Sequence, residues 1–198
     1  MIRHLASVSS IALSGLLGAW STVGQQGSPI PPREQQIAAA VLPLPTELRA
    51  DATVLGYGPN GKLTTLRQGA GAMTCLASNP QLKDFHVACY HNSMEPFMAR
   101  GRELRQQGVK DDQVDTVRFR EVKAGKIRMP TTASLYQLFG GTFDPNSGTV
   151  TGAAALFVVY IPFATPATSG LSARPVKDAP WIMFPGTPKA HIMFTPKM

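Results

Sequence analysis

The chain lacks the sequence signatures that would identify its chemistry. After the first 24 residues, no apolar run is long enough to cross a bilayer as a helix. There is no H-E-x-x-H pattern of the kind that holds zinc in proteases, and no G-x-S-x-G pattern around a hydrolase nucleophile. No internal repeat is visible. The sequence therefore indicates a fold class and a compartment more firmly than it indicates a reaction.

Cysteine is also scarce, because the chain contains only Cys75 and Cys89. Both lie in segments of alternating polarity, residues 73–78 and 85–90, which predict two strands joined by a turn. If this hairpin is symmetric about Leu82, the two cysteines lie opposite each other, with Cα atoms about 4.5 Å apart. We therefore predict a disulfide worth roughly 3 kcal/mol. The alternative is a pair of reduced, buried cysteines.

The N-terminus has the pattern of a secretory signal peptide. Arg3 supplies a positive charge before the apolar residues 11–20, so we predict a signal peptide over residues 1–24. Residues 25–32 are predicted to form a disordered linker. No cysteine follows the apolar run at which a lipid could be attached. We therefore expect a periplasmic or secreted protein without a transmembrane segment after processing, in a compartment where disulfides persist.

The clearest helix follows the disulfide hairpin. Ser93 is expected to cap its N-terminus, with Glu95 in the first turn and Gly108 just beyond its end. A second helix is predicted over residues 112–123, with Asp111 or Asp112 as its cap. The apolar stripe of the first helix follows three-and-four spacing and comprises Met94, Phe97, Met98, Gly101 and Leu104.

The remaining segments are mostly strand-like. Residues 52–57 and 62–68 predict a hairpin around Asn60-Gly61, which we favour over a phosphate-binding reading of the G-x-G-x-x-G match there. The most apolar run, residues 153–161, predicts a central strand buried on both faces. Further elements are expected as a helix over residues 32–41, a strand over 135–139 and a closing hairpin over 181–184 and 190–194. We therefore predict one α+β domain over residues 33–198, an antiparallel sheet with the two central helices packed on one face. The alternative is a β-barrel with those helices as an insertion.

Four stretches of the chain resemble a group of exported, signal-peptide-bearing bacterial proteins of unassigned function. They are residues 53–57 (TVLGY), 88–91 (ACYH), 95–104 (EPFMARGREL) and 180–193 (PWIMFPGTPKAHIM). The similarity covers residues 35–193. It implies export and a single domain, and it implies no activity, ligand or catalytic residue.

Tyr90, His91, Glu95 and His191 form the candidate binding site beside the hairpin and the first central helix. His91 and Glu95 lie where the hairpin meets this helix, and His191 could approach from another element. A histidine paired with a carboxylate can act as a general base. Adding His86 to His91, Glu95 and His191 creates a candidate set of ligands for a divalent metal. No other cofactor is expected.

The formal net charge of +7 favours anionic partners, and in the envelope these include lipid headgroups and cell-wall polymers. Acidic residues are interspersed with the basic ones along the central helices, which argues against nucleic acid. Three functions are therefore carried forward. The first is a non-catalytic envelope protein that binds a small ligand or a partner. The second is a metal-dependent or His-based hydrolase using His91, Glu95 and His191, and the third is a purely structural envelope protein.

Overall fold

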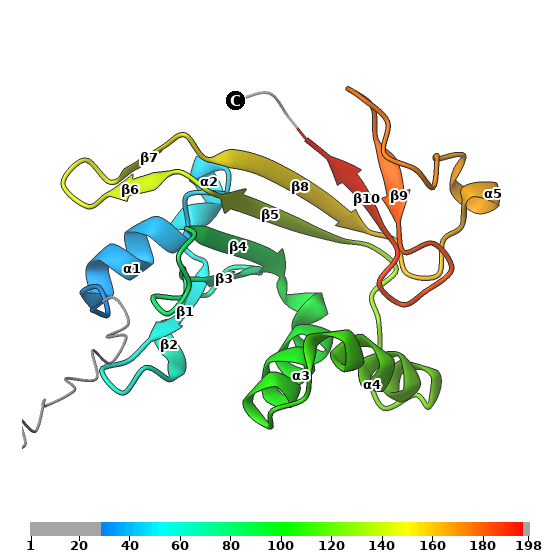
Figure 1. Cartoon of the computed structure of the whole chain (residues 1–198), viewed down its shortest axis with the longest axis horizontal. Helices are drawn as coiled ribbons and strands as arrows, with labels where there is room; N and C mark the ends of the chain where they lie inside the picture. The colour runs from blue at the N-terminus through cyan, green and yellow to red at the C-terminus, as the bar shows by residue number, and fades with distance from the viewer. Residues whose placement is uncertain (1–28, 196–198) are drawn as a thin grey trace, which may run out of the picture.

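Eight strands form one open sheet at the centre of the computed structural model, which describes residues 29–195 (Figure 1). The predicted signal peptide and residues 25–28 of the predicted linker lie outside this range. Residues 29–32 lead directly into the first helix, and the Pro31 carbonyl accepts a hydrogen bond from Gln36 Nε2 at 2.8 Å. In their order across the sheet, the strands are β2 (Leu63–Arg67), β1 (Thr53–Tyr57), β3 (Met73–Leu76), β4 (His86–His91), β5 (Ala133–Phe139), β8 (Ala154–Tyr160), β10 (His191–Phe194) and β9 (Trp181–Met183).

The sheet is antiparallel except at one pair, because β1 and β3 run parallel. The prediction of a wholly antiparallel sheet is therefore wrong at this position. After the β1–β2 hairpin the chain turns back and places β3 on the far side of β1, so β3 runs in the direction of β1. The return passes close to Asp51, where a Cβ on Gly69 would lie 2.1 Å from the Asp51 carbonyl oxygen. Glycine at this position permits the close approach of the two backbones.

The barrel alternative is wrong, because the described part of the chain leaves β2 and β9 as separate edges of the sheet. The mixed α+β class and the strand-rich last third are as predicted. Residues 140–152 contain a small separate hairpin of β6 (Thr142–Asp144) and β7 (Thr149–Thr151). Figure 1 shows this hairpin extending beyond the ends of β5 and β8.

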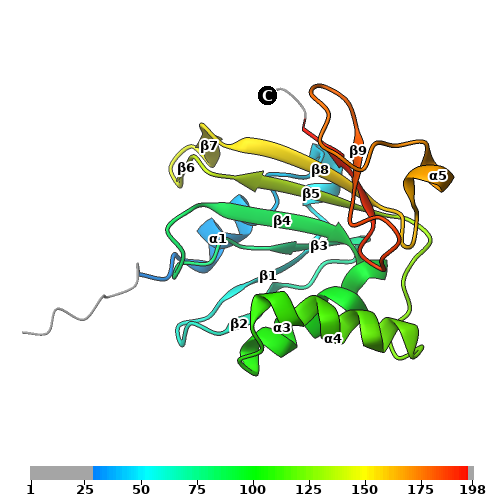
Figure 2. The ribbon, with the colours of Figure 1, turned by 45° about the vertical axis from the view of Figure 1, so that its right-hand side comes forward.

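Helices lie on both faces of the sheet (Figure 2). The first helix, residues 33–40, lies on one face, and the two central helices, residues 95–106 and 111–123, lie on the other. None of the helices in residues 29–195 combines the length and apolarity needed to cross a membrane. Two expected caps are wrong: Asp111 lies inside its helix, and a 3₁₀ turn precedes the helix that Ser93 was expected to cap. The helices are α1 (Arg33–Ala40), α2 (Thr46–Arg49), the 3₁₀ turn η1 (Asn92–Met94), α3 (Glu95–Gln106), α4 (Asp111–Lys123) and α5 (Pro166–Ser169).

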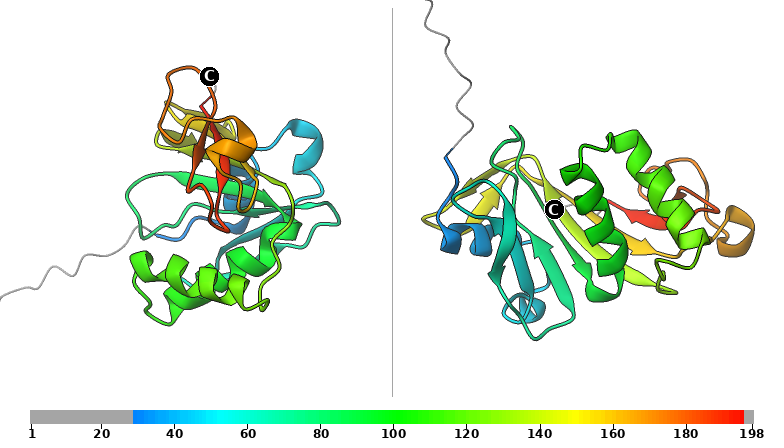
Figure 3. Two further views of the ribbon diagram at one scale, coloured as in Figure 1. Left: turned by 90° about the vertical axis from the view of Figure 1, so that its right-hand side faces the viewer. Right: turned by 90° about the horizontal axis from the view of Figure 1, so that it is seen from below.

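α3 and α4 pack together on one face of the sheet, as predicted, and cross its strands (Figure 3, right). The apolar stripe of α3 supplies the contact, because Phe97 and Leu104 are at most 3% exposed. Arg118 of α4 crosses onto α3 at Gly101, where a Cβ would lie 2.8 Å from Arg118 Nη1. The core between these helices and the sheet contains the buried residues Tyr90, Met94, Phe97, Ile127, Ala133, Leu135, Val158 and Tyr160.

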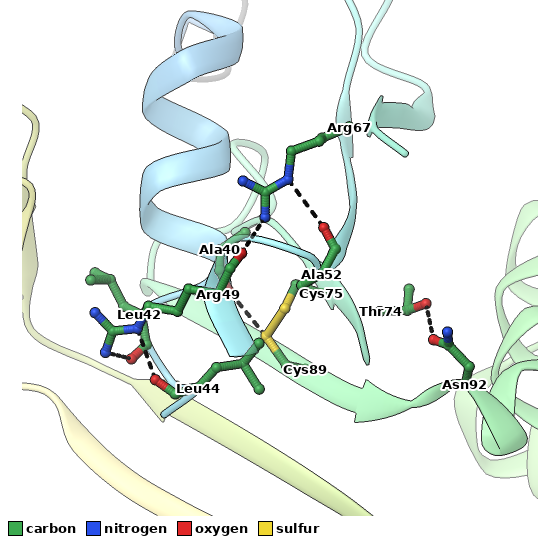
Figure 4. Close-up of a disulfide and its surroundings, with 10 residues drawn as sticks. All are labelled: Ala40, Leu42, Leu44, Arg49, Ala52, Arg67, Thr74, Cys75, Cys89 and Asn92. Atoms are coloured by element: carbon green, nitrogen blue, oxygen red, sulfur yellow. Dashed lines mark hydrogen bonds between the residues drawn. A yellow bond between two sulfur atoms is a disulfide. The ribbon is translucent and has the colours of Figure 1, made fainter. Parts of the chain in front are cut away.

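The opposite face is covered by α1 and contains the predicted disulfide. Cys75 and Cys89 lie directly opposite each other on β3 and β4, with a Cα–Cα distance of 4.0 Å and an S–S bond of 2.05 Å. Both cysteines are fully buried, and Cys89 Sγ lies 3.2 Å from the Ala40 carbonyl oxygen at the end of α1 (Figure 4). The disulfide therefore joins β3 and β4 beneath α1.

Arginine side chains hold the irregular segments around this core through backbone carbonyls. Arg33 donates to Leu66 O, and Arg67 donates to the carbonyls of Ala52 and Arg49. Arg49 Nε donates to Leu44 O at 2.8 Å, and its Nη2 donates to Leu42 O at 2.9 Å (Figure 4). These bonds satisfy carbonyls that have no place in a helix or a strand ladder.

On the α1 face, the core around α1 spans β1, β2, β3 and β4 and reaches only Tyr136 of β5. The other half of this face is formed by β5, β8 and β10. The prediction that residues 153–161 are buried on both faces is therefore wrong, because Phe157 and Val159 are only half-buried. The partly open half of this face determines where a ligand can lie.

Candidate functional site

Tyr90 and Glu95, two of the predicted site residues, meet where β4 leads into α3. The Tyr90 hydroxyl donates a short hydrogen bond to Glu95 Oε2. Arg102, two turns further along α3, binds both: its Nη1 lies 2.8 Å from the Tyr90 oxygen and its Nη2 lies 2.6 Å from Glu95 Oε1. The seven-residue spacing of Glu95 and Arg102 places them on the same side of the helix. This spacing is the signal by which the sequence could have identified Arg102.

This cluster links the end of β4 to the start of α3. Burial raises the pKa of Tyr90, and the hydrogen bond to Glu95 raises it further. The Tyr90 ring is 2% exposed and belongs to the core beneath α3. The phenol keeps its proton near neutral pH and donates it to Glu95 in a hydrogen bond. It therefore serves as a fixed hydrogen-bonding group.

The side chains of His91 and Ser93 contact each other at the entry to α3. His91 Nδ1 accepts a hydrogen bond from the Ser93 backbone N–H at 3.2 Å and lies 2.8 Å from Ser93 Oγ. The expected Ser93 cap is wrong because this hydroxyl points back to His91. The first residue before α3 is Met94, which has no capping side chain.

His191 lies in a different cluster, where the turn before β10 meets α4. Its Nδ1 is 2.6 Å from the Lys189 carbonyl oxygen, and its ring packs against Tyr160 and Phe184. Lys189 Nζ in turn lies 2.8 Å from Asp115 Oδ2 on α4, and Arg118 donates a short hydrogen bond to Asp115 Oδ1. His191 is therefore a buried residue beside Lys189, whose ammonium group joins the turn before β10 to α4.

The electrostatics of this cluster depend on burial and on two cations. Burial lowers the pKa of His191, and the nearby Lys189 charge lowers it further, although the hydrogen bond to the Lys189 carbonyl acts in the opposite direction. Burial alone would raise the pKa of Asp115. The hydrogen bonds and charges of Lys189 and Arg118 outweigh it, and the pKa of Asp115 is lowered.

We expect the free energy of unfolding to fall as the pH drops below about 6.5, where a histidine in the unfolded chain takes up a proton. The folded state resists this proton because the pKa of His191 is lowered, so the unfolded chain binds more protons in this range. Urea denaturation at intervals between about pH 7.5 and pH 5 would measure the slope. This range lies above the ordinary pKa of the carboxylates, 3.8 for Asp115 and 4.5 for Glu121.

His191→Asn is the control for this prediction, because its side-chain amide can still donate toward the Lys189 carbonyl but does not titrate. The variant should show a flatter profile than the wild type over the same range. Equal slopes for the two proteins would show that His191 does not cause the pH dependence.

The candidate metal ligands are not brought together. His91 and His191 lie on β4 and β10, three strand spacings apart, which is about 14 Å, and on opposite faces of the sheet. His86 lies at the far end of β4, where its Nε2 is 2.7 Å from Gln137 Oε1. Within residues 29–195, no three His, Cys, Asp or Glu side chains gather closely enough to hold a metal ion. Among these residues, His91, Glu95 and His191 therefore do not form a three-ligand metal site.

The larger hollows lie elsewhere, on the partly open half of the α1 face. One cavity of about 760 Å³ and another of about 550 Å³ share Tyr136 and Phe157 and together form what we call the sheet groove. The rings of Tyr136 and Phe157 meet edge to face at 5.4 Å on its floor. One end is bounded by residues 42–45 and Arg49, and the other by residues 178–180 and Phe194.

The sheet groove was not predicted from the sequence. Each of its cavities has a volume typical of ligand-binding sites, and most lining side chains are apolar. The groove runs along β8 from Ala155 to Val159, a rise of four residue steps, or about 13 Å. The only sequence signal is the apolar run of β8, AALFVVY, which does not show which face is uncovered.

A third cavity of about 460 Å³ lies between the start of α1, the β3–β4 turn and the β6–β7 hairpin. Phe85 and Phe143 stack within it at 6.2 Å, and Leu82 is 63% exposed at its rim. None of the sequence-predicted site residues lines this cavity or the sheet groove. Comparison with protein-family models, curated proteins and solved structures finds no match to this chain.

Proposed function

We propose that this chain is an exported, non-catalytic binding domain whose ligand is an elongated apolar molecule lying in the sheet groove. The observation that carries the proposal is the groove itself, where two cavities share Tyr136 and Phe157 as lining residues on a sheet face that α1 covers only in part. Half-buried aromatic rings on a sheet gain free energy when a ligand removes them from water, at roughly 25 cal/mol per Å² of apolar surface.

The chemistry of the groove favours binding over catalysis. Apolar side chains such as Phe157, Val159 and Phe194 can shape and desolvate a ligand, but they cannot transfer protons or attack a bond. The residues on which the hydrolase alternative depends, His91, Glu95 and His191, lie outside the groove. The structural alternative remains distinct, since a purely structural protein would show no saturable binding at this face.

Export is supported by the Cys75–Cys89 disulfide, because such bonds persist mainly in oxidising compartments. The predicted signal peptide points to the same location, the periplasm or the exterior. Anionic envelope components are proposed as the class of partner because the chain has a net charge of +7.

The proposal is tested with Nile red, a neutral apolar dye whose fluorescence rises when it leaves water. We expect saturable binding to the purified protein and a roughly tenfold loss of affinity in Phe194→Asp, because a carboxylate at the rim must lose water when the dye binds. Phe194 is already 37% exposed, so this substitution disturbs the fold little. Fluorescence titration gives both dissociation constants.

Phe139→Asp is the matched control, since Phe139 is 43% exposed at the end of β5 but lies on the opposite face of the sheet. This variant should bind Nile red like the wild type. Absence of saturable binding, or an equal loss of affinity in both variants, would reject the sheet groove as the ligand site. Dye binding accompanied by a doubling of the molecular mass in light scattering would assign the groove to a second copy of the chain instead.

A further inference from the structure

Among the described residues that line the sheet groove, one carries a fixed positive charge, and it lies at one end of the groove. Arg49 lines the groove where residues 42–45 bound it. Its guanidinium is held in place by the Leu44 and Leu42 carbonyls, at 2.8 Å from Nε and 2.9 Å from Nη2. Figure 4 shows this group directed away from the disulfide, with the two carbonyls beside it.

The contacts of Arg49 leave its charge and most of its donors unmatched. A guanidinium has five N–H groups, and the two backbone carbonyls accept from two of them. Within the described range, no carboxylate lies within 4.0 Å of Arg49. The two carbonyls fix the orientation of the guanidinium without neutralising it, so the remaining N–H groups can bind an anion.

We propose that the ligand of the sheet groove is an apolar chain ending in a carboxylate, with the chain over Tyr136 and Phe157 and the carboxylate on Arg49. This inference rests on the proposed function, because it specifies the ligand of the same groove. A planar guanidinium matches the geometry of a carboxylate and forms two parallel hydrogen bonds with it. An unbranched chain fits a groove that follows one strand for about 13 Å.

The arrangement also fixes the direction in which the ligand lies. Residues 178–180 line the end of the groove opposite Arg49. A carboxylate is attracted to the Arg49 end by the charge of the guanidinium. The chain therefore extends from Arg49 toward residues 178–180 and Phe194.

The test is competition for bound Nile red by decanoate and by 1-decanol, which share a chain and differ in the charge of the head group. We expect decanoate to displace the dye at a concentration roughly tenfold lower than decanol, since a charge-assisted contact is worth more than a neutral one. Arg49→Gln should remove this preference by weakening decanoate alone. The preference should also shrink at high salt.

Arg33→Gln is the matched control, because Arg33 also holds a backbone carbonyl, that of Leu66, but does not line the groove. This variant should keep the preference for decanoate. Should Arg49→Gln fail to fold, the comparison of the two ligands on the wild-type protein still decides the question.

The outcomes separate this inference from the proposed function. If Nile red binds and both competitors displace it equally, the groove binds apolar chains but Arg49 does not select their head group. If Arg49→Gln weakens both competitors equally, Arg49 only supports the wall formed by residues 42–45. If Nile red does not bind the wild-type protein, the proposed function itself is rejected.

Discussion

Reducing the Cys75–Cys89 disulfide is expected to lower the free energy of unfolding by about 3 kcal/mol. The bond closes a loop between residues 14 apart, and in the chain-entropy model a loop of this size restricts the unfolded chain by that amount. Because domains are stable by only about 5–15 kcal/mol, this loss is large. Urea denaturation of the oxidised and reduced protein measures it directly, and the m-value should rise as the unfolded chain expands.

The reduced wild-type protein is the proper comparison, because both sulfur atoms stay in the buried space beneath α1. The double variant Cys75→Ala with Cys89→Ala should be less stable still, since it also leaves a small void. Equal stability of the oxidised and reduced proteins would contradict the prediction. It would also weaken the case for export, because the fold would then have no need of an oxidising compartment.

The disulfide hairpin could be predicted because everything that defines it is local. Alternating polarity marks each strand, and the turn between them sets which residues lie opposite. Cys75 and Cys89 are opposite each other at the predicted register. The hairpin of β1 and β2 was predictable in the same way from Asn60-Gly61.

The helices could be predicted, but their caps could not. Three-and-four spacing identified the face of α3 that Phe97 and Leu104 bury. A cap, however, depends on where one hydroxyl points. The Ser93 hydroxyl lies 2.8 Å from His91 Nδ1, and α3 has no capping side chain. The same sequence pattern therefore fits two hydrogen-bonding arrangements that only the three-dimensional structure distinguishes.

The candidate site was predicted only in part, because it depends on which strands become neighbours. Tyr90 and Glu95 are five residues apart and meet through a hydrogen bond, whereas His91 and His191 could meet only if β4 and β10 were adjacent. The insertion of β5 and β8 between them is not encoded in any local pattern. The sheet groove was missed for the same reason, since it exists only because α1 covers one half of a sheet face.

Phe97→Ala is expected to lower the free energy of unfolding by about 4 kcal/mol, the range for truncating a buried phenylalanine. Phe97 is 1% exposed between α3 and the sheet. Its ring also lies 3.9 Å from the guanidinium carbon of Arg118, which is 5% exposed and binds Asp115. Truncation therefore leaves a void and also removes the aromatic face against which a buried cation packs.

Two control variants separate these contributions in the same urea measurement. Phe97→Leu keeps most of the apolar volume but not the aromatic face, so it should cost about 1.5 kcal/mol or less beyond the loss of the cation–π contact. Phe163→Ala removes a phenylalanine that is 54% exposed and should change stability by no more than about 0.5 kcal/mol. If Phe97→Ala proved as mild as Phe163→Ala, α3 would not be held to the sheet through Phe97. Other contacts would then have to hold α4 in place, such as the bond between its Asp115 and Lys189.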